Sequence, residues 1–291
     1  MSDWLDAPPP APPVSLAGAF RASARFTLLG NLVYPGLLVL MLLRLVERPL
    51  FGRRRPWTPA ITRAVCRASL PALGLRYIRH GRPMRGAGAV VANHASWLDI
   101  FTLNAGQRVC FVAKREVAGW FGIGILARAT GTVFIARRSG EAGRQRAEMA
   151  ARLRDGHRLL FFPEGTSSDS LRVLAFKSSL FEAVFAPGLP SGFHVQPVTV
   201  IYHAPSGQDA RFYGWWGDMS FVPHLRRVLS VRRRGTVEII YHPPVAVADF
   251  ADRKALARHC EAVIRAAHDA ALRDGTPAAG KAGTAAAASG N

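Results

Sequence analysis

Short apolar runs alternate with helix-like segments along most of the chain. Six runs have the length and composition of buried strands: 88–92, 109–113, 132–136, 158–162, 194–202 and 235–241. Three further segments have the spacing or composition of helices: 97–103, 141–154 and 250–272. Strands that alternate with helices predict an α/β fold, in which helices cover the faces of a sheet.

A long apolar segment precedes this α/β region. Phe26 to Leu43 is 18 residues without a charged side chain. As a helix it would be about 27 Å long, close to the roughly 30 Å of a bilayer's hydrocarbon core. Pro35 and Gly36 interrupt the run, so a straight span, a kinked span, a re-entrant helix and a buried core helix all stay open. Because charged residues follow where a cleavage site would lie, a cleaved signal peptide fits poorly, and we predict a membrane-anchoring helix over 26–48.

Basic residues around the apolar segment predict its orientation. Two arginines precede it, Arg21 and Arg25, and five follow it at positions 44, 48, 53, 54 and 55. The positive-inside rule then places the rest of the chain in the cytoplasm. We divide the chain into a flexible N-terminus (1–25), the anchor (26–48), one α/β domain (49–272) and a disordered Ala/Gly tail (273–291).

Composition narrows the class of protein. Hydrophobic residues make up 49% of the chain, which argues against intrinsic disorder as the main state. The 38 basic and 19 acidic residues give a net charge of +19, so the surface attracts nucleic acid, anionic lipid or acidic carriers. A nucleic-acid binder is disfavoured because the arginines are scattered and no reader motif is present. The three cysteines lie far apart without metal-ligand spacing, so we expect no structural metal.

The first candidate for catalysis follows the strand at 88–92. His94 lies at the end of that strand, and Asp99 follows five residues later. A histidine acts as a general base when a carboxylate holds its other ring nitrogen, fixes the tautomer and stabilises the imidazolium. Taken alone, the pair is a weak signal, and an ordinary surface histidine is the more common explanation. No G-x-S-x-G motif is present, so a covalent serine mechanism finds no support.

Other strand ends carry further polar groups. Arg137 ends the strand at 132–136 and suits a bidentate grip on phosphate or carboxylate. Glu164 and Thr166 follow the next strand, and Gly165 between them lets the backbone approach a ligand. Pro197 interrupts the strand at 194–202, which normally indicates an edge strand or a bulge. Each feature alone is compatible with a solvated surface.

Taken in order, these segments resemble the four motif blocks of the glycerolipid and lysophospholipid acyltransferase family. The blocks are Asn93-His94-x4-Asp99, Gly131 to Arg137, Phe162-Pro-Glu-Gly-Thr166 and Pro197-Val198. The resemblance covers about residues 88–200, and more weakly extends to Tyr241. It implies a membrane-bound acyltransferase domain with a mixed sheet, which moves a fatty acyl group from acyl-CoA or acyl carrier protein to a lipid hydroxyl. It implies no metal or other cofactor, and no nucleic-acid partner.

The resemblance also implies roles for individual residues. His94 becomes the general base and Asp99 the residue that orients it, while Arg137, Glu164 and Gly165 bind the acceptor, together with the neighbouring Thr166 and Lys177. This agrees with the chemistry, because a lipid hydroxyl is a poor nucleophile at neutral pH and needs a base. A thiolate leaving group needs little protonation, and backbone N–H groups near the motif turns are suited to stabilise the oxyanion.

One position bears on the acceptor. Lysophosphatidate acyltransferases commonly carry arginine directly after Glu-Gly-Thr, whereas this chain has Ser167. Phosphate recognition would then depend on Arg137 and Lys177. The variant Thr166-Ser-Ser-Asp169 is similar to that of bacterial lyso-ornithine lipid acyltransferases, which esterify the 3-hydroxyl of an amide-linked fatty acid. Asp169 is then either a partner for the ammonium headgroup or an ordinary turn or cap residue.

The expected function is therefore acyl transfer to lyso-ornithine lipid. The expectation includes 1-acylglycerol-3-phosphate as a second acceptor. The expected location is the bacterial inner membrane, with the catalytic domain facing the cytoplasm. The main alternative is a dedicated 1-acylglycerol-3-phosphate acyltransferase, and a remoter one is a non-enzymatic basic protein that binds membranes or nucleic acid.

Overall fold

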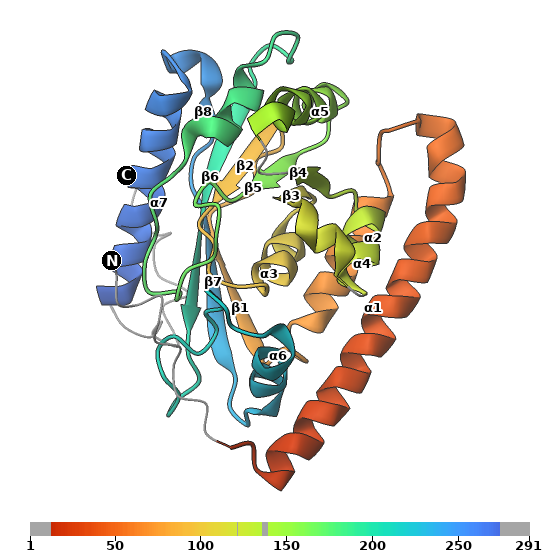
Figure 1. The fold of residues 1–291 in the computed structure, drawn as a ribbon, viewed down its shortest axis with the longest axis vertical. Coiled ribbons are helices and arrows are strands. Elements are labelled where there is room, and N and C mark those ends of the chain that lie inside the picture. Colours follow the sequence, from red (N-terminus) through yellow and green to blue (C-terminus); the bar gives the residue numbers. More distant parts are fainter. Residues whose placement is uncertain (1–12, 121, 136–138, 274–291) are drawn as a thin grey trace, which may run out of the picture.

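A computed structural model describes residues 13–120, 122–135 and 139–273, and Figure 1 shows its sheet with helices on both faces. The strands are β1 (Leu75–His80), β2 (Gly88–Ala92), β3 (Cys110–Lys114), β4 (Val133–Ile135), β5 (Leu159–Phe161), β6 (His194–His203), β7 (Gly235–Tyr241) and β8 (Val245–Ala246). The α-helices are α1 (Leu16–Phe51), α2 (Thr58–Ser69), α3 (Asp99–Gly106), α4 (Ile123–Ala129), α5 (Ala142–Arg154), α6 (Phe221–Ser230) and α7 (Arg253–Arg273). Short 3₁₀ helices are η1 (Arg115–Gly119), η2 (Ser139–Glu141), η3 (Ser178–Phe185) and η4 (Val247–Asp249). The α/β prediction is confirmed.

The sheet is mixed, as expected. Its order is β1-β7-β6-β2-β5-β3-β4, and β8 pairs with β6. Strand β2 is parallel to β5 and β6, whereas β7 is antiparallel to β6. Because β2 and β5 are parallel neighbours, the loops that follow them leave the same edge of the sheet. Those loops carry the histidine and glutamate motifs.

Burial on both faces explains why the central strands read as continuous apolar runs. Helices α2, α3 and α6 cover one face of the sheet, and α5 and α7 cover the other (Figure 1). All five residues of β2 are buried. Val90 and Ala92 pack in the first layer, whereas Ala89 and Val91 pack in the second. A strand buried on both faces needs no polar alternation, so the apolar run predicted it correctly.

The prediction of an edge strand around Pro197 is wrong, since β6 lies in the centre of the sheet. Strand β2 lies on one side of β6, and β7 and β8 share the other side. Pro197 falls between their pairings, because β8 pairs as far as Val195 and β7 begins at Val198. The proline carbonyl accepts the N–H of His242 at 3.1 Å. The missing proline N–H therefore coincides with the break between two partner strands.

The N-terminal helix begins earlier than predicted. Helix α1 starts at Leu16, so residues 16–25 are helical and not part of a flexible N-terminus; residues 1–12 and the tail 274–291 lie outside the described residues. Ser15 caps the helix by accepting the N–H of Gly18 at 3.2 Å. The Arg25 guanidinium donates to two carbonyls at the end of α6, which ties this first part of α1 to the domain.

Helix α1 continues through Pro35 and lies along one flank of the domain, next to α2 and α6 (Figure 1). Near its C-terminal end Glu47 is fully buried and accepts the N–H groups of Trp57 and Thr58 at 2.7 and 3.0 Å. Only 11% of the most apolar window of α1 is buried, so the core-helix alternative is wrong. By length and composition α1 is the one helix in the described part of the chain that could cross a membrane.

Candidate active site

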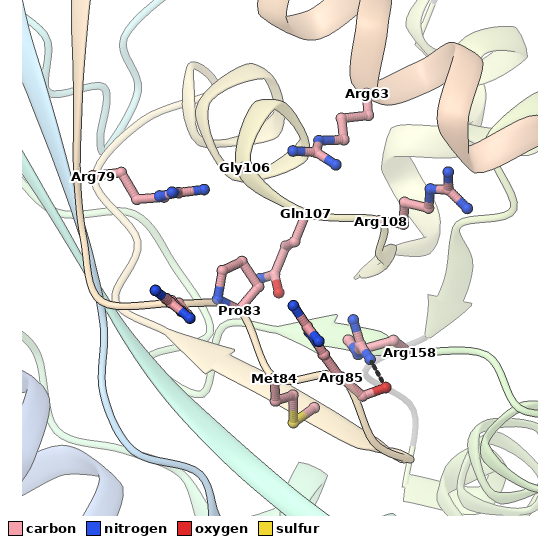
Figure 2. Close-up of a pocket in the computed structure, with 10 residues that line it drawn as sticks. Arg63, Arg79, Pro83, Met84, Arg85, Gly106, Gln107, Arg108 and Arg158 are labelled. Carbon is pink, nitrogen blue, oxygen red and sulfur yellow. Dashed lines mark hydrogen bonds between the residues drawn. The ribbon is translucent and has the colours of Figure 1, made fainter.

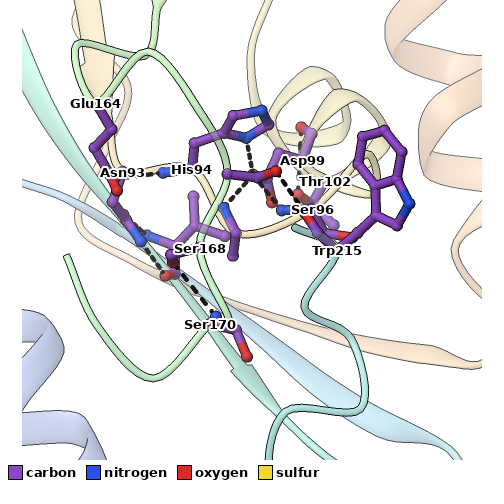
Figure 3. Close-up of polar contacts among 12 residues, drawn as sticks. Asn93, His94, Ser96, Asp99, Thr102, Glu164, Ser168, Ser170 and Trp215 are labelled. Atoms are coloured by element: carbon purple, nitrogen blue, oxygen red, sulfur yellow. Dashed lines mark hydrogen bonds and ion pairs between the residues drawn. The ribbon is translucent and has the colours of Figure 1, made fainter. Parts of the chain in front are cut away.

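The predicted histidine–aspartate pair forms at the end of β2. His94 Nδ1 lies 2.7 Å from Asp99 Oδ2 (Figure 3). A carboxylate only accepts hydrogen bonds here, so Nδ1 carries the proton and Nε2 keeps a free lone pair. The histidine side chain is 22% exposed, and no described residue forms a hydrogen bond with Nε2. The ring is therefore oriented as a base that faces an incoming ligand.

The Asp99 carboxylate organises the whole turn that carries His94. Besides the imidazole, its Oδ2 accepts the N–H groups of Ala95 and Ser96 at 2.8 and 3.1 Å. Its other oxygen accepts the hydroxyl of Tyr202 at 2.7 Å, and the residue is completely buried. Four donors around one carboxylate keep it an acceptor for the imidazole. Residues 94–98 form a turn around the Asp99 carboxylate, which explains why His94 and Asp99 are five residues apart.

Two neighbours fix the position of the imidazole and its turn. Phe162 stacks on the His94 ring, with centroids 4.0 Å apart and planes 13° apart. Asn93 joins β2 to β6, since its amide donates to the carbonyl of Val200 and accepts the N–H of Val200, both at 2.8 Å. The stacked Phe162 ring restricts the plane of the His94 imidazole. The two hydrogen bonds of Asn93 fix the end of β2, from which His94 projects.

Glu164 supports the histidine from inside the protein. Its side chain is 2% exposed, and its oxygens accept the N–H of His94 at 2.8 Å and that of Leu174 at 3.0 Å. Burial raises the pKa of Glu164 to about 8, against the opposing effect of the two N–H donors. This carboxyl positions the loop after β2 relative to the loop after β5. A direct contact between Glu164 and the acceptor stays a prediction.

The other expected acceptor residues lie around the turn after β5. Gly165 has a φ of +73°, a backbone conformation that favours glycine. If residue 165 carried a side chain, its Cβ would lie 3.2 Å from the Nζ atom of Lys177. Thr166 and Lys177 are exposed. Arg137 lies outside the described residues. Their contacts with an acceptor stay predictions.

The structure contradicts the expected role of Asp169. This side chain is 1% exposed and makes a bidentate ion pair with Arg172, with a shortest separation of 2.9 Å. It also accepts the N–H of Leu171 at 3.1 Å. A carboxylate that is buried and neutralised in this way does not present a charge to a headgroup. Ser167 is also turned inward, because its hydroxyl donates to the carbonyl of Trp215.

Tyr202 was not singled out in the sequence, and its role follows from the sheet. It belongs to β6, which lies beside β2, and its hydroxyl reaches Asp99 across the core. Its side chain is 1% exposed. The only signal in the sequence is a tyrosine hydroxyl within the buried stretch of β6. Buried hydroxyls need partners, so such a residue indicates a buried polar group nearby.

We predict that Tyr202→Phe lowers kcat about tenfold, the value of one hydrogen bond to a charged group, and leaves both KM values unchanged. The variant removes a donor from Asp99, so the imidazole is held less firmly while the substrate surfaces stay intact. Steady-state kinetics of the purified enzyme measure this split. Tyr213→Phe is the matched control, because Tyr213 is also buried but bonds only the backbone of Gly74 and Gly235. It should lower thermal stability without lowering kcat; equal kcat for both variants would refute the positioning role.

Together these contacts fit a class of enzyme in which a histidine base, oriented by a buried carboxylate, takes a proton from a hydroxyl group. No described group of three or more His, Cys, Asp or Glu side chains is arranged to hold a metal ion. The comparisons with known proteins agree with this class. A family model described as Acyltransferase matches residues 74–201.

Individual relatives make the assignment firmer. A lyso-ornithine lipid O-acyltransferase of Rhodobacter capsulatus is 57% identical over 263 residues, which cover 90% of this chain and 95% of the relative. A 1-acyl-sn-glycerol-3-phosphate acyltransferase of Neisseria gonorrhoeae is 32% identical over 182 residues, 61% of this chain and 68% of the relative. The crystal structure of the acyltransferase PlsC from Thermotoga maritima shares the fold, with a TM-score of 0.60 and 23% identity over 89% of this chain and 95% of that one. The chain belongs to the acyltransferase family and is a lysolipid acyltransferase.

Proposed function

We propose that this enzyme transfers a fatty acyl group from acyl carrier protein or CoA to the 3-hydroxyl of lyso-ornithine lipid. The observation that carries the proposal is the 57% identity to a lyso-ornithine lipid O-acyltransferase along 95% of that protein. Ser167 after the Glu-Gly-Thr motif supports it, because this neutral side chain is turned inward and offers no cation to a phosphate. A dianionic phosphate at a partly dry site needs more than one cationic partner.

The proposed reaction uses one base and no covalent enzyme intermediate. His94 Nε2 takes the proton from the lipid hydroxyl while the hydroxyl oxygen attacks the thioester carbonyl. Asp99 stabilises the imidazolium that forms, through the contact at 2.7 Å. The tetrahedral intermediate then collapses, the carbon–sulfur bond breaks, and the thiolate leaves with the electron pair. The imidazolium returns the proton to solvent or to the thiolate, which restores the base.

The membrane location is part of the proposal. Helix α1 is bound to the domain near both ends, through Arg25 and Glu47, and many of its exposed side chains are large and apolar. A helix attached along the flank of its own domain suits shallow insertion into one leaflet better than a free span. The arginines that follow the apolar run support a catalytic domain on the cytoplasmic side of the inner membrane.

A direct assay tests the acceptor. Purified enzyme in mixed micelles receives labelled acyl groups on acyl carrier protein or on CoA, together with lyso-ornithine lipid or lysophosphatidate. We expect the highest catalytic efficiency with lyso-ornithine lipid. Equal or greater efficiency with lysophosphatidate would contradict this acceptor and leave the acyltransferase assignment intact. The two donors in parallel show which carrier the enzyme uses.

Lysophosphatidate is a second candidate acceptor, favoured by the Neisseria relative and by the exposed Lys177 ammonium beside Gly165. We predict that Lys177→Ala lowers efficiency about tenfold with lysophosphatidate, the size of one charge-assisted hydrogen bond, and less with lyso-ornithine lipid. The phosphate dianion depends more strongly on a cation than the zwitterionic aminolipid does. Lys254→Ala is the matched control, since Lys254 is exposed on α7. Equal losses for both acceptors would show that Lys177 does not distinguish the headgroups.

A further inference from the structure

A second concave site lies at the opposite edge of the sheet from His94. It has a volume of about 580 Å³, within the range typical of small-molecule sites. Residues just before β2, β3 and β5 line it, whereas His94 and Glu164 follow β2 and β5. The five residues of β2 separate the two sites, roughly 16 Å at 3.3 Å per residue. Figure 2 shows this pocket.

Its lining is strongly cationic. Six arginines contribute to it: Arg63, Arg79, Arg82, Arg85, Arg108 and Arg158. No aspartate or glutamate is among the lining residues, and no described carboxylate forms an ion pair with any of the six. Positive charges that share one concave space repel one another, and concave walls concentrate their field. An anion in the pocket would relieve that repulsion.

Several of the guanidinium groups are available for a ligand. Arg63 and Arg108 make only long contacts of 3.4 Å, each with one backbone carbonyl. Arg158 donates to the carbonyls of Arg85 and Gly86, which fixes its position beneath the loop before β2. Arg79 and Arg85 have exposed side chains without a described hydrogen-bond partner. The pocket thus combines one guanidinium held by two carbonyls, two with one long contact each and two without a described hydrogen bond.

Gln107 provides independent support for a ligand. Its side chain is 3% exposed, and neither the amide nitrogen nor the amide oxygen has a hydrogen-bond partner. Figure 2 shows this amide pointing into the space that the arginines surround. A buried amide without partners costs about 1–3 kcal/mol of stability, so this amide fits a site where a bound molecule supplies the missing partner.

We propose that this pocket binds a ligand with several phosphate charges, with the arginines gripping phosphate oxygens and the Gln107 amide donating to the ligand. Guanidinium groups match phosphate oxygens in bidentate geometry, and several phosphate charges balance several arginines. Two sources supply this chemistry: a soluble polyphosphate, such as the 3′-phosphoadenosine diphosphate end of CoA, or a lipid headgroup with two phosphates. The inference does not depend on which lysolipid is the acceptor.

Pyrophosphate is the probe for the test. The full-length enzyme in neutral detergent is heated with increasing pyrophosphate, and calorimetric titration gives the Kd. We expect a saturable rise in unfolding temperature for the wild type, because a ligand that binds only the folded state stabilises it. The double variant Arg79→Gln with Arg85→Gln should bind at least about tenfold more weakly, as expected for lost charge-assisted hydrogen bonds.

Two variants separate the pocket from general charge and from misfolding. Arg232→Gln with Arg258→Gln removes the same charge from exposed arginines outside the pocket and should leave binding unchanged. Gln107→Leu removes the unpartnered amide, so the free protein should be at least as stable as the wild type while pyrophosphate binds more weakly. A wild type without saturable binding would overturn the proposal. Equal binding by the pocket variants and the control pair would also overturn it.

Two further arms identify the source of the phosphate. If CoA is the ligand, it competes with pyrophosphate, and the pocket variants raise KM for acyl-CoA but not for acyl carrier protein. If a lipid headgroup is the ligand, flotation with phosphatidylcholine vesicles containing cardiolipin exceeds that without it, and the pocket variants lose the excess. If CoA does not compete and cardiolipin does not increase flotation, while pyrophosphate still binds, the ligand is a free polyphosphate.

Discussion

His94→Ala should lower acyl transfer by roughly 10²- to 10⁴-fold, the usual contribution of a general base, and leave membrane association intact. The His94 side chain is 22% exposed, and its Nε2 atom has no hydrogen-bond partner among the described residues. Its removal leaves the lipid hydroxyl without a base. Initial rates with labelled thioester, measured on purified protein, give the loss.

Asp99→Asn is the informative companion variant. It keeps the size of the side chain but removes the charge that stabilises the imidazolium, so we expect a smaller loss than for His94→Ala. Both proteins should unfold cooperatively and sediment with membranes as the wild type does. Wild-type-like rates for His94→Ala would contradict the mechanism.

Serine at Leu38, Leu42 and Leu45 together should release most of the enzyme from membranes. These side chains are 59%, 55% and 72% exposed on α1, and they share one face because they are spaced four and three residues apart. Burial of each leucine in the bilayer contributes about 1.5–3 kcal/mol, so the three together should weaken partitioning by more than about a hundredfold. Flotation with vesicles measures the effect.

Substitution is a sharper test than deletion of the helix. Without α1, the buried N–H groups of Trp57 and Thr58 would lose Glu47 as their acceptor, so the domain itself would be destabilised. The triple variant keeps this contact, and its unfolding temperature in detergent should match the wild type. Residual binding should fall in high salt, because it comes from the net positive charge. Undiminished flotation of the triple variant in high salt would contradict the role of α1.

Features that depend on neighbours along the chain were predictable from the sequence. The central strands are buried on both faces, so each leaves a run of apolar residues that is visible without the fold. The contact between His94 and Asp99 forms within one turn, so its spacing already indicated it. Strand β1 and helices α2, α4 and α6 were missed, and β1 and α2 show why. Strand β1 lies at a sheet edge with exposed polar side chains, and α2 exposes arginines, so neither shows an apolar run.

The availability of charged side chains was the least predictable property, because it depends on which groups the fold brings next to each charge. In the sequence Asp169 is a carboxylate that a ligand could contact, whereas in the structure it is buried and paired with Arg172. The two backbone N–H groups that the Glu164 oxygens accept were likewise not visible in the sequence. Whether a carboxylate faces substrate or protein is decided by packing, which local sequence does not encode.

The sequence by itself determined the α/β class and the order of the motif blocks, because apolar runs and the order of residues along the chain specify them. Its short-range spacing also predicted that His94 and Asp99 meet. Only the tertiary structure decided that Tyr202 completes the site. Tyr202 is 103 residues from Asp99 along the chain, and the two meet because β6 pairs with β2. The tertiary structure also decided that arginines between positions 63 and 158 form one cationic pocket. Parallel strands align their ends in space regardless of the length of chain between them, so residues scattered along the sequence meet at one edge of the sheet.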